Sequence, residues 1–169
     1  IIASGHGATD IRAHLTPELA GTYSILGQNG NYAESKDGTI LWSRSLFQTQ
    51  KDAIHNFIQK ARAKLHYDVR DENDIVDDRD SQIAFSLIGH HEDKEKKHAF
   101  DPTHEKRLAL LADMPEDLQK LTDAEVEVQS GGTTVLDFFS LGKNKGYNVG
   151  EFITAMGWSA SDCIFIGEK

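Results

Sequence analysis

Short apolar runs separated by turn residues dominate the first part of the chain. Ile1-Ile2-Ala3 predicts a strand that ends at the turn Ser4-Gly5-His6-Gly7. A helix capped by Thr9 or Asp10 is expected next, because apolar residues then recur at helical spacing. The apolar face of this helix would consist of Ile11, Leu15 and Leu19.

A strand and a hairpin are expected after this helix. The strand covers residues 23–26 and ends at Gln28-Asn29-Gly30, which is a strong turn signal. The hairpin pairs residues 31–34 with residues 39–42 around the turn Lys36-Asp37-Gly38.

The middle of the chain has a different pattern, with longer helices and alternating strands. Residues 49–65 repeat apolar side chains at helical spacing, and residues 104–121 predict one or two further helices. Residues 81–88, 124–129 and 133–139 alternate as half-buried strands do, and Gly131-Gly132 joins the last two. This predicts an α+β insertion with antiparallel pairing. The expected buried stripe of the second helical stretch is Leu108, Leu111, Leu118 and Leu121.

The end of the chain returns to an α/β pattern. Residues 147–156 predict a helix that stops at Gly157, and Cys163 to Ile166 predict a strand that is buried on both faces. We therefore expect residues 1–47 and 143–169 to share one sheet, with residues 48–142 as an inserted domain.

Composition and charge narrow the class of protein. The chain has 169 residues, of which 38% are apolar and 27% are charged, with a net charge of −9. No apolar run reaches the roughly 20 residues that span a bilayer, and the acidic balance argues against nucleic-acid partners. The single Cys163 fits a reducing cytoplasm. The loose histidine group at residues 90–104 matches no zinc pattern.

Three places combine small residues with groups that suit phosphate chemistry. Ser4 follows a strand, where its hydroxyl and the nearby backbone N–H groups can hold a phosphate oxygen. Lys145 begins a helix and can neutralise an anion as a point charge. Glu168 ends an apolar run and offers the hard oxygen ligand that Mg²⁺ prefers. Each place alone also has an ordinary structural reading, as a turn or a solvated loop.

Taken in this order, the three places resemble the later motifs of the haloacid dehalogenase (HAD) superfamily. The insertion is similar in size and order to that superfamily's type-IIB cap, and Gln28-Asn29-Gly30 resembles the Glu-Asn-Gly tract that precedes this cap. Within the superfamily the chain is most similar to phosphomannomutases and related sugar-phosphate phosphatases. The tracts that carry this likeness are Arg79 to Gly89, Ser130 to Asp137 and Lys145-Gly146.

The resemblance implies a fold, a reaction and a set of roles. The fold is α/β, with an incomplete HAD-like Rossmannoid core and an inserted α+β type-IIB cap. The reaction is attack of an Asp carboxylate on phosphorus, with Mg²⁺ as cofactor and a phosphorylated sugar as substrate. Ser4 and Lys145 would be catalytic, and Glu168 would lie near the metal. The substrate-binding residues would be Gly5, Asn29, Arg79, His90 and Asp137. A homodimer is compatible with the resemblance, although the sequence does not fix the oligomeric state.

Two family motifs are not in the printed sequence. These are the Asp-x-Asp nucleophile motif, which precedes the Ser4 motif in the family, and the Gly-Gly-Asn-Asp metal loop, which would follow Lys169. We therefore expect a fragment that has no turnover alone.

Three residues depart from the phosphomannomutase pattern. His90 stands where these enzymes tend to have an arginine for a second phosphate, Val135 replaces a serine, and Glu168 replaces an aspartate. An imidazole holds phosphate less well than a guanidinium. These departures favour a phosphatase of a monophosphorylated sugar over a mutase. A non-catalytic module that binds sugar phosphate or a protein partner is the remaining alternative.

Overall fold

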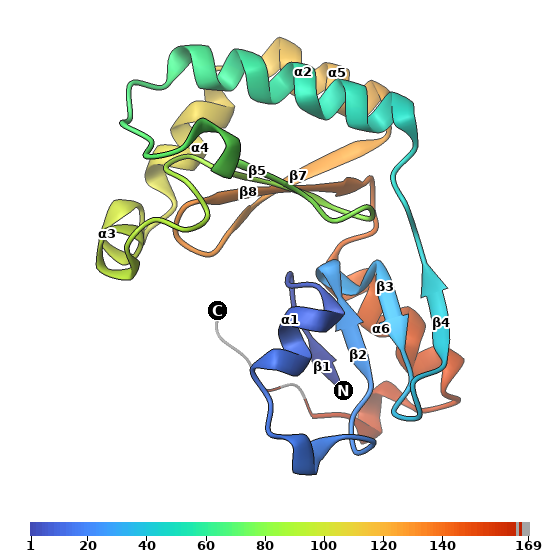
Figure 1. Ribbon diagram of the computed structural model, residues 1–169. Coiled ribbons are helices and arrows are strands. Elements are labelled where there is room, and N and C mark those ends of the chain that lie inside the picture. The colour runs from blue at the N-terminus through green and yellow to red at the C-terminus, as the bar shows by residue number, and fades with distance from the viewer. Residues whose placement is uncertain (165, 167–169) are drawn as a thin grey trace. The chain divides into compact units, whose positions relative to one another are not determined.

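The computed structural model describes residues 1–164 and residue 166 of the chain. It divides into two compact units (Figure 1). The split unit consists of Ile1–Ser43 and Lys143–Lys169, and the inserted unit is Arg44–Gly142. The first boundary falls before Arg44, whereas the sequence pattern placed it after Phe47.

A four-stranded sheet organises the split unit. Strand β1 (Ile2–Ala3) pairs in parallel with β2 (Ile25–Gly27), and antiparallel pairing then adds β3 (Tyr32–Glu34) and β4 (Ile40–Ser43). The expected hairpin is therefore present. The helices of the split unit are α1 (Ala8–Ala13) and α6 (Lys145–Ala155), and short 3-10 turns lie at Pro17–Leu19, Gln28–Gly30 and Ala160–Asp162.

The buried apolar cluster of the split unit is small. Leu26, Ala33 and Phe152 form its centre. The Trp42 ring packs edge-on against Phe152 at a centroid distance of 6.2 Å, and its Nε1 donates to the carbonyl O of Gly30 at 2.9 Å. This ties the strand β4 to both the helix α6 and the turn at Gln28–Gly30.

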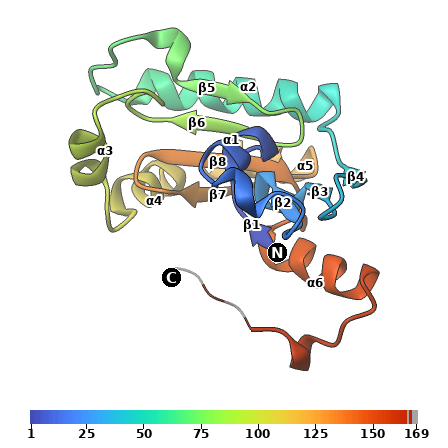
Figure 2. The same ribbon diagram turned by 60° about the horizontal axis from the view of Figure 1, so that its bottom comes forward.

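A second four-stranded sheet, wholly antiparallel, forms the inserted unit. Its strands are β5 (Val76–Asp78), β6 (Ile83–Ser86), β7 (Val126–Gly131) and β8 (Val135–Ser140), in the order β5-β6-β8-β7 (Figure 2). Helices α2 (Gln48–Lys64) and α5 (Pro115–Asp123) lie over one face (Figure 1). Helices α3 (Lys94–Phe100) and α4 (Glu105–Ala112) complete the unit, with a 3-10 turn at Glu72–Asp74.

Large apolar side chains fill the space between this sheet and its helices. Phe57 of α2 packs edge-on against Phe138 of β8, with ring centroids 5.5 Å apart. Alternation along β6 and β8 sends Ile83, Phe85, Leu136 and Phe138 to this core. By the same alternation, Ala84 and Asp137 belong to the opposite face.

A buried ion pair closes one end of the inserted unit. Arg107 is fully buried and donates from Nε to Asp101 Oδ2 at 2.8 Å. Its Nη1 donates to three carbonyl oxygens around the β7–β8 turn, those of Gly131 (2.7 Å), Gly132 (2.9 Å) and Val135 (3.1 Å). The guanidinium thus links Asp101 to the carbonyl groups of the β7–β8 turn.

Three sequence predictions need correction. Helix α1 ends at Ala13, and Leu19 is 43% exposed in a separate 3-10 turn, because Pro17 disfavours helix in the residue before it. Leu108 is 55% exposed, and Leu110 and Met114 are buried instead.

The third correction concerns the apolar strand expected at Cys163 to Ile166, at the end of the chain. Phe165 lies outside the described residues, but Cys163, Ile164 and Ile166 are not part of a strand, and Ile164 is 89% exposed. A strand is held by a ladder to a neighbour, and none of the strands in the described part of the chain pairs with these residues. Among the described helices, none is long and apolar enough to cross a bilayer.

Candidate functional site

The loop after β1 presents the hydroxyl of Ser4. Its Oγ accepts a hydrogen bond from the backbone N of His6 at 3.2 Å, which folds the loop into a tight turn. An oxygen that accepts in this way keeps its own O–H for donation to another group. Ser4 therefore has the geometry of a residue that can donate to an anionic oxygen at the carboxyl end of a parallel strand.

The Gln28–Gly30 turn lies against the Ser4 loop. The backbone N of Asn29 donates to the O of Ser4, and that of Gln28 donates to the O of His6, both at 2.9 Å. Gln28, Asn29 and Gly30 all have positive φ, of 53°, 55° and 83°. Two consecutive non-glycine residues in this region are strained, which is typical of functional loops.

Lys145 stands at the start of α6, which the same turn contacts. Asn144 caps the helix by accepting from the backbone N of Tyr147 at 3.0 Å. Lys145 is half-buried, and no carboxylate among the described residues pairs with its ammonium group. A lysine at a helix N-terminus adds its charge to the positive end of the helix dipole, so this position suits an anion.

The magnesium ligand that the resemblance implies is Glu168. Glu168 lies outside the described residues. Within the described part of the chain, no group of three or more His, Cys, Asp or Glu side chains converges as a metal site would.

Two expected substrate residues of the inserted unit lie in hydrogen-bonded pairs. Arg79 donates from Nε to Asp77 Oδ2 at 2.7 Å, and Gln82 donates from Nε2 to Asp137 Oδ1 at 2.7 Å. Asp77 and Asp137 are both register partners of Ala84, so they belong to the face opposite α2 and α5. This face combines carboxylates, an amide and a guanidinium, which suit recognition of hydroxyl groups.

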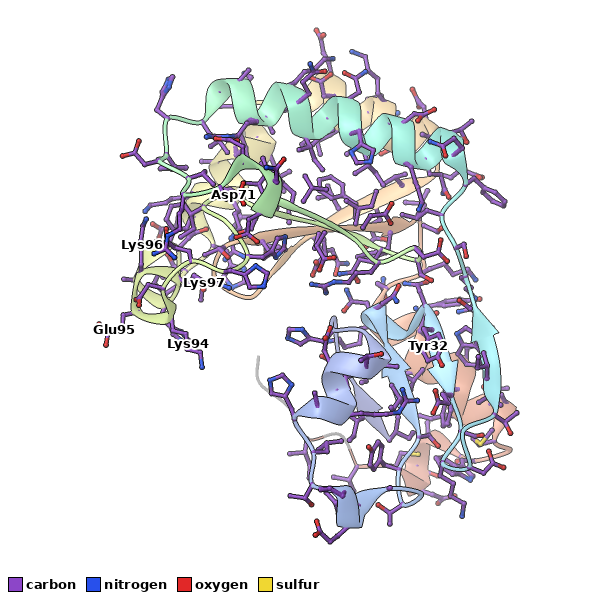
Figure 3. The ribbon with its side chains drawn as sticks, viewed as in Figure 1. Tyr32, Asp71, Lys94, Glu95, Lys96 and Lys97 are labelled. Atoms are coloured by element: carbon purple, nitrogen blue, oxygen red, sulfur yellow. The ribbon has the colours of Figure 1, made fainter. Side chains whose placement is uncertain are left out.

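His90 is held at the edge of the same sheet by three contacts. Its Nε2 lies 3.2 Å from the carbonyl O of Ala84, its backbone N donates to the O of Asp74 at 3.0 Å, and Lys97 of α3 (Figure 3) donates to its carbonyl O at 2.6 Å. A carbonyl only accepts, so Nε2 carries the hydrogen and Nδ1 is the acceptor of the neutral ring. Burial lowers the pKa of His90, and the nearby Asp77 and Asp74 only partly oppose this.

The structure thus brings part of the predicted set together. Ser4, Gly5, Asn29 and Lys145 belong to the split unit, where Asn29 contacts the Ser4 loop directly. Arg79, His90 and Asp137 belong to the inserted unit, where His90 and Asp137 are both linked to Ala84 of β6.

Sequence reasoning missed two buried asparagines, Asn31 and Asn148. Both are at most 1% exposed, and each donates to backbone carbonyls of other loops. A polar residue inside an apolar helix pattern, as Asn148 is between Tyr147 and Val149, was the available signal.

Comparison with solved structures places the fold. The chain is similar to a HAD-like hydrolase from Bacteroides thetaiotaomicron (TM-score 0.57, 10% identity, 93% of this chain and 64% of that one). It is also similar to SMU.1108c from Streptococcus mutans UA159 (TM-score 0.62, 14% identity, 93% and 62%). A third similar structure is BT4131, described as a sugar phosphatase of HAD subclass IIB (TM-score 0.51, 14% identity, 94% and 62%).

These likenesses establish the fold, and the chain spans less than two thirds of each of the three proteins. No curated protein matches the sequence. The α/β architecture with an inserted α+β unit agrees with the fold class expected from the sequence. A sequence model of haloacid dehalogenase-like hydrolases matches residues 1–169. The chain therefore belongs to the haloacid dehalogenase-like hydrolase family.

Proposed function

We propose that this chain is part of a Mg²⁺-dependent phosphatase that acts on a monophosphorylated sugar through an aspartyl-phosphate intermediate. The observation that carries the proposal is the hydrogen-bonded link between the Ser4 loop and the loop before Lys145, made through Asn29. In a member of this family, a hydroxyl donor and an ammonium group joined in this way suit a transferring phosphoryl group.

The chemistry divides between Ser4, Lys145 and groups outside the described residues. An Asp carboxylate, which the resemblance places upstream of Ser4, would attack phosphorus while the bond to the sugar oxygen breaks. Water would then release phosphate from the aspartyl-phosphate. Ser4 would donate its O–H to a phosphoryl oxygen, and Lys145 would neutralise developing charge, which is how positioning and electrostatics lower this kind of barrier. The Mg²⁺ requirement follows from the family resemblance alone.

The choice of a monophosphate rests on His90 and its surroundings. A neutral ring that uses Nε2 on the carbonyl O of Ala84 offers only an acceptor, and two carboxylates, Asp77 and Asp137, belong to the same sheet. An acceptor and carboxylates bind sugar hydroxyls and repel a second phosphate. The likeness in fold to a protein described as a sugar phosphatase supports the same substrate class. Phosphomannomutase activity is the alternative, and it would need a cation at the position of His90, because the guanidinium of Arg79 is paired with Asp77.

Phosphate release from a panel of sugar phosphates tests this function. We expect release, abolished by a chelator, from a protein that is extended at both ends to include the Asp-x-Asp and Gly-Gly-Asn-Asp motifs. The 169-residue chain alone is expected to be inactive. Release by the short chain would show that the nucleophile lies among its own residues. Silence of both proteins would favour the binding-module alternative, which direct binding of the same sugar phosphates would then examine.

Replacement of His90 by arginine separates phosphatase from mutase. In the extended protein, His90→Arg would place a guanidinium beside the sheet, and each charge-assisted hydrogen bond is worth about 1.5–3 kcal/mol. We expect the variant to bind hexose bisphosphates at least about tenfold more tightly than the wild type does, since 1.4 kcal/mol is tenfold. His91→Arg is the matched control, because His91 is exposed and paired with Asp74. Equal bisphosphate affinity of His90→Arg and wild type would contradict this role.

A further inference from the structure

Two buried amide groups converge on one backbone carbonyl just before Lys145. The Nδ2 of Asn31 lies 3.0 Å from the O of Lys143, and the Nδ2 of Asn148 lies 2.8 Å from the same oxygen. Asn31 is 1% exposed and Asn148 is 0% exposed. Both lone pairs of this carbonyl are therefore used by side chains from distant parts of the sequence.

The same two amides also hold the strained turn. Asn31 Nδ2 donates to the O of Gln28 at 3.1 Å, and Asn148 Nδ2 donates to the O of Asn29 at 2.8 Å. The orientation of both amides follows from these bonds, since the carbonyl oxygens of Gln28, Asn29 and Lys143 can only accept. A side chain with an oxygen in place of Nδ2 would lose all of these bonds.

Gly30 packs so closely against Asn148 that no larger residue fits at position 30 without a shift. A Cβ added to Gly30 would overlap the Cβ of Asn148. The φ of Gly30 is also +83°, which other residues rarely adopt. The turn and the first turn of α6 are thus in direct contact.

A continuous chain of hydrogen bonds connects the two proposed catalytic residues. It runs from the carbonyl of Ser4 to the backbone N of Asn29, and from the carbonyl of Asn29 to the amide of Asn148. It then reaches the carbonyl of Lys143, two residues before Lys145. Asn148 is the side chain that joins the two halves of this chain.

We propose that Asn148 is a positioning residue that sets the separation between Ser4 and Lys145 through its two hydrogen bonds. The inference rests on the proposed function, in which these two residues hold the transferring phosphoryl group. Asn148 acts only through the loops that carry them. Phosphoryl transfer depends on positioning, and a displacement of about 1 Å can cost about 10²-fold in rate.

The test is a double-mutant cycle in the extended protein. Asn148→Asp keeps the shape of the side chain and removes the donor. We expect its kcat to fall by about 10²-fold with a smaller change in KM, since the lost alignment matters most in the transition state. Introduced together with Lys145→Ala, the same substitution is expected to lower kcat by less than about threefold further, because its effect passes through Lys145.

Asn56→Asp is the matched control. It makes the same chemical change at an exposed position of the helix α2 in the inserted unit, outside the loops that carry Ser4 and Lys145. We expect its kcat to stay within about twofold of the wild type. The folded fraction of every variant is measured by hydrogen exchange, so that kcat refers to folded protein only.

The outcomes separate the inference from the function beneath it. Equal kcat of folded Asn148→Asp and wild type overturns the positioning role, as does a full additional loss in the Lys145→Ala background. If Asn148→Asp does not fold, Asn148→Ser takes its place in the cycle, because a hydroxyl on the shorter side chain cannot bridge both carbonyls. An absence of phosphate release by the wild-type extended protein overturns the proposed function, and this inference with it.

Discussion

The two units of this chain differ in the interactions that stabilise each of them internally. The inserted unit buries a large apolar cluster between one sheet face and the helices α2 and α5. In the described part of the split unit, the apolar cluster centres on Leu26, Ala33 and Phe152. Hydrogen bonds between loops, such as those from Asn31 and Asn148 to the carbonyl O of Lys143, also stabilise the split unit. A unit that is stabilised by core packing tolerates change in its surface loops. In the split unit, by contrast, the proposed site residues lie in or beside the same loops whose hydrogen bonds stabilise the unit.

The largest expected effect on this comparison comes from Arg107, whose charged side chain is fully buried in the inserted unit. Arg107→Met would leave Asp101 buried without its guanidinium partner and would remove the hydrogen bonds from Nη1 to three carbonyl groups. We expect a loss of about 3–5 kcal/mol in the free energy of unfolding, the usual cost of breaking a buried pair by removing one partner. Urea unfolding measures this, and hydrogen exchange locates it in the inserted unit.

The control for Arg107 is Lys120→Met. Lys120 makes only an exposed pair with Asp117, which contributes little. A loss of similar size in both variants would mean that the buried position of Arg107 does not matter.

Gly30 offers the corresponding change in the split unit. Gly30→Ala forces a non-glycine residue to a φ of +83° and overlaps Asn148. We expect a cost of about 1–3 kcal/mol, with faster hydrogen exchange in α6 and the turn. Gly38→Ala is the matched control, since its φ is +88° but open space surrounds it. If both variants lose the same stability, the contact with Asn148 adds nothing to the backbone strain.

Sequence pattern predicted the inserted unit better than the site in the split unit. Helix α2 follows from helical spacing. The apolar residues that recur at this spacing are buried at Ile54, Phe57, Ile58 and Ala61, and Leu65 packs against the core. The predicted stripe was right for Leu121, which is buried, and for Leu111 and Leu118, which pack against the core. It was wrong at Leu108, because the neighbouring Arg107 takes the inward position, which a charge is not expected to do without a partner such as Asp101. Periodicity shows where apolar surface goes, and it cannot show a long-range ion pair.

The candidate site shows the same limit more strongly. Ser4, Asn29 and Lys145 could be proposed from local motifs and a family resemblance. The hydrogen bond from Asn148 to the carbonyl O of Asn29 joins residues that are 119 positions apart, and no pattern in the sequence predicts it. The strand expected at Cys163 to Ile166 fails for a related reason, since a strand depends on a partner that its own residues do not specify.

Ile54→Val asks how closely packed the inserted unit is. Ile54 is fully buried against the sheet, so the variant removes one methyl group from the core without touching a hydrogen bond. We expect a loss of about 0.5–1.5 kcal/mol in the free energy of unfolding, measured in urea. Ile40→Val, at a 59% exposed position of β4, is the control and is expected to change stability by less than about 0.5 kcal/mol. A cost below that of the control would show that the core is loosely packed at Ile54.

The smallest expected effect is a pH dependence that again distinguishes the two units. Burial acts to raise the pKa of Asp101, but the hydrogen bonds from Arg107 and from the backbone of Lys106 outweigh it, and the pKa is lowered. A carboxylate with a lowered pKa in the folded state contributes stability that is fully present above its unfolded pKa of about 3.9. That contribution is lost as the pH falls through the folded value. We therefore expect the inserted unit to lose protection from hydrogen exchange as the pH is lowered below about 4.

Asp101→Asn should flatten this pH dependence, because the amide does not titrate. Glu34 of the split unit provides the matching test. Burial acts to raise its pKa, but the hydrogen bonds from Arg12 and Tyr32 outweigh this effect, so the pKa is lowered. Glu34→Gln should therefore flatten the acid sensitivity of β3 and leave that of the β7–β8 turn unchanged. If Asp101→Asn retained the full acid sensitivity of the β7–β8 turn, the buried pair would not be its source, and the inserted unit would owe its behaviour in acid to its surface carboxylates.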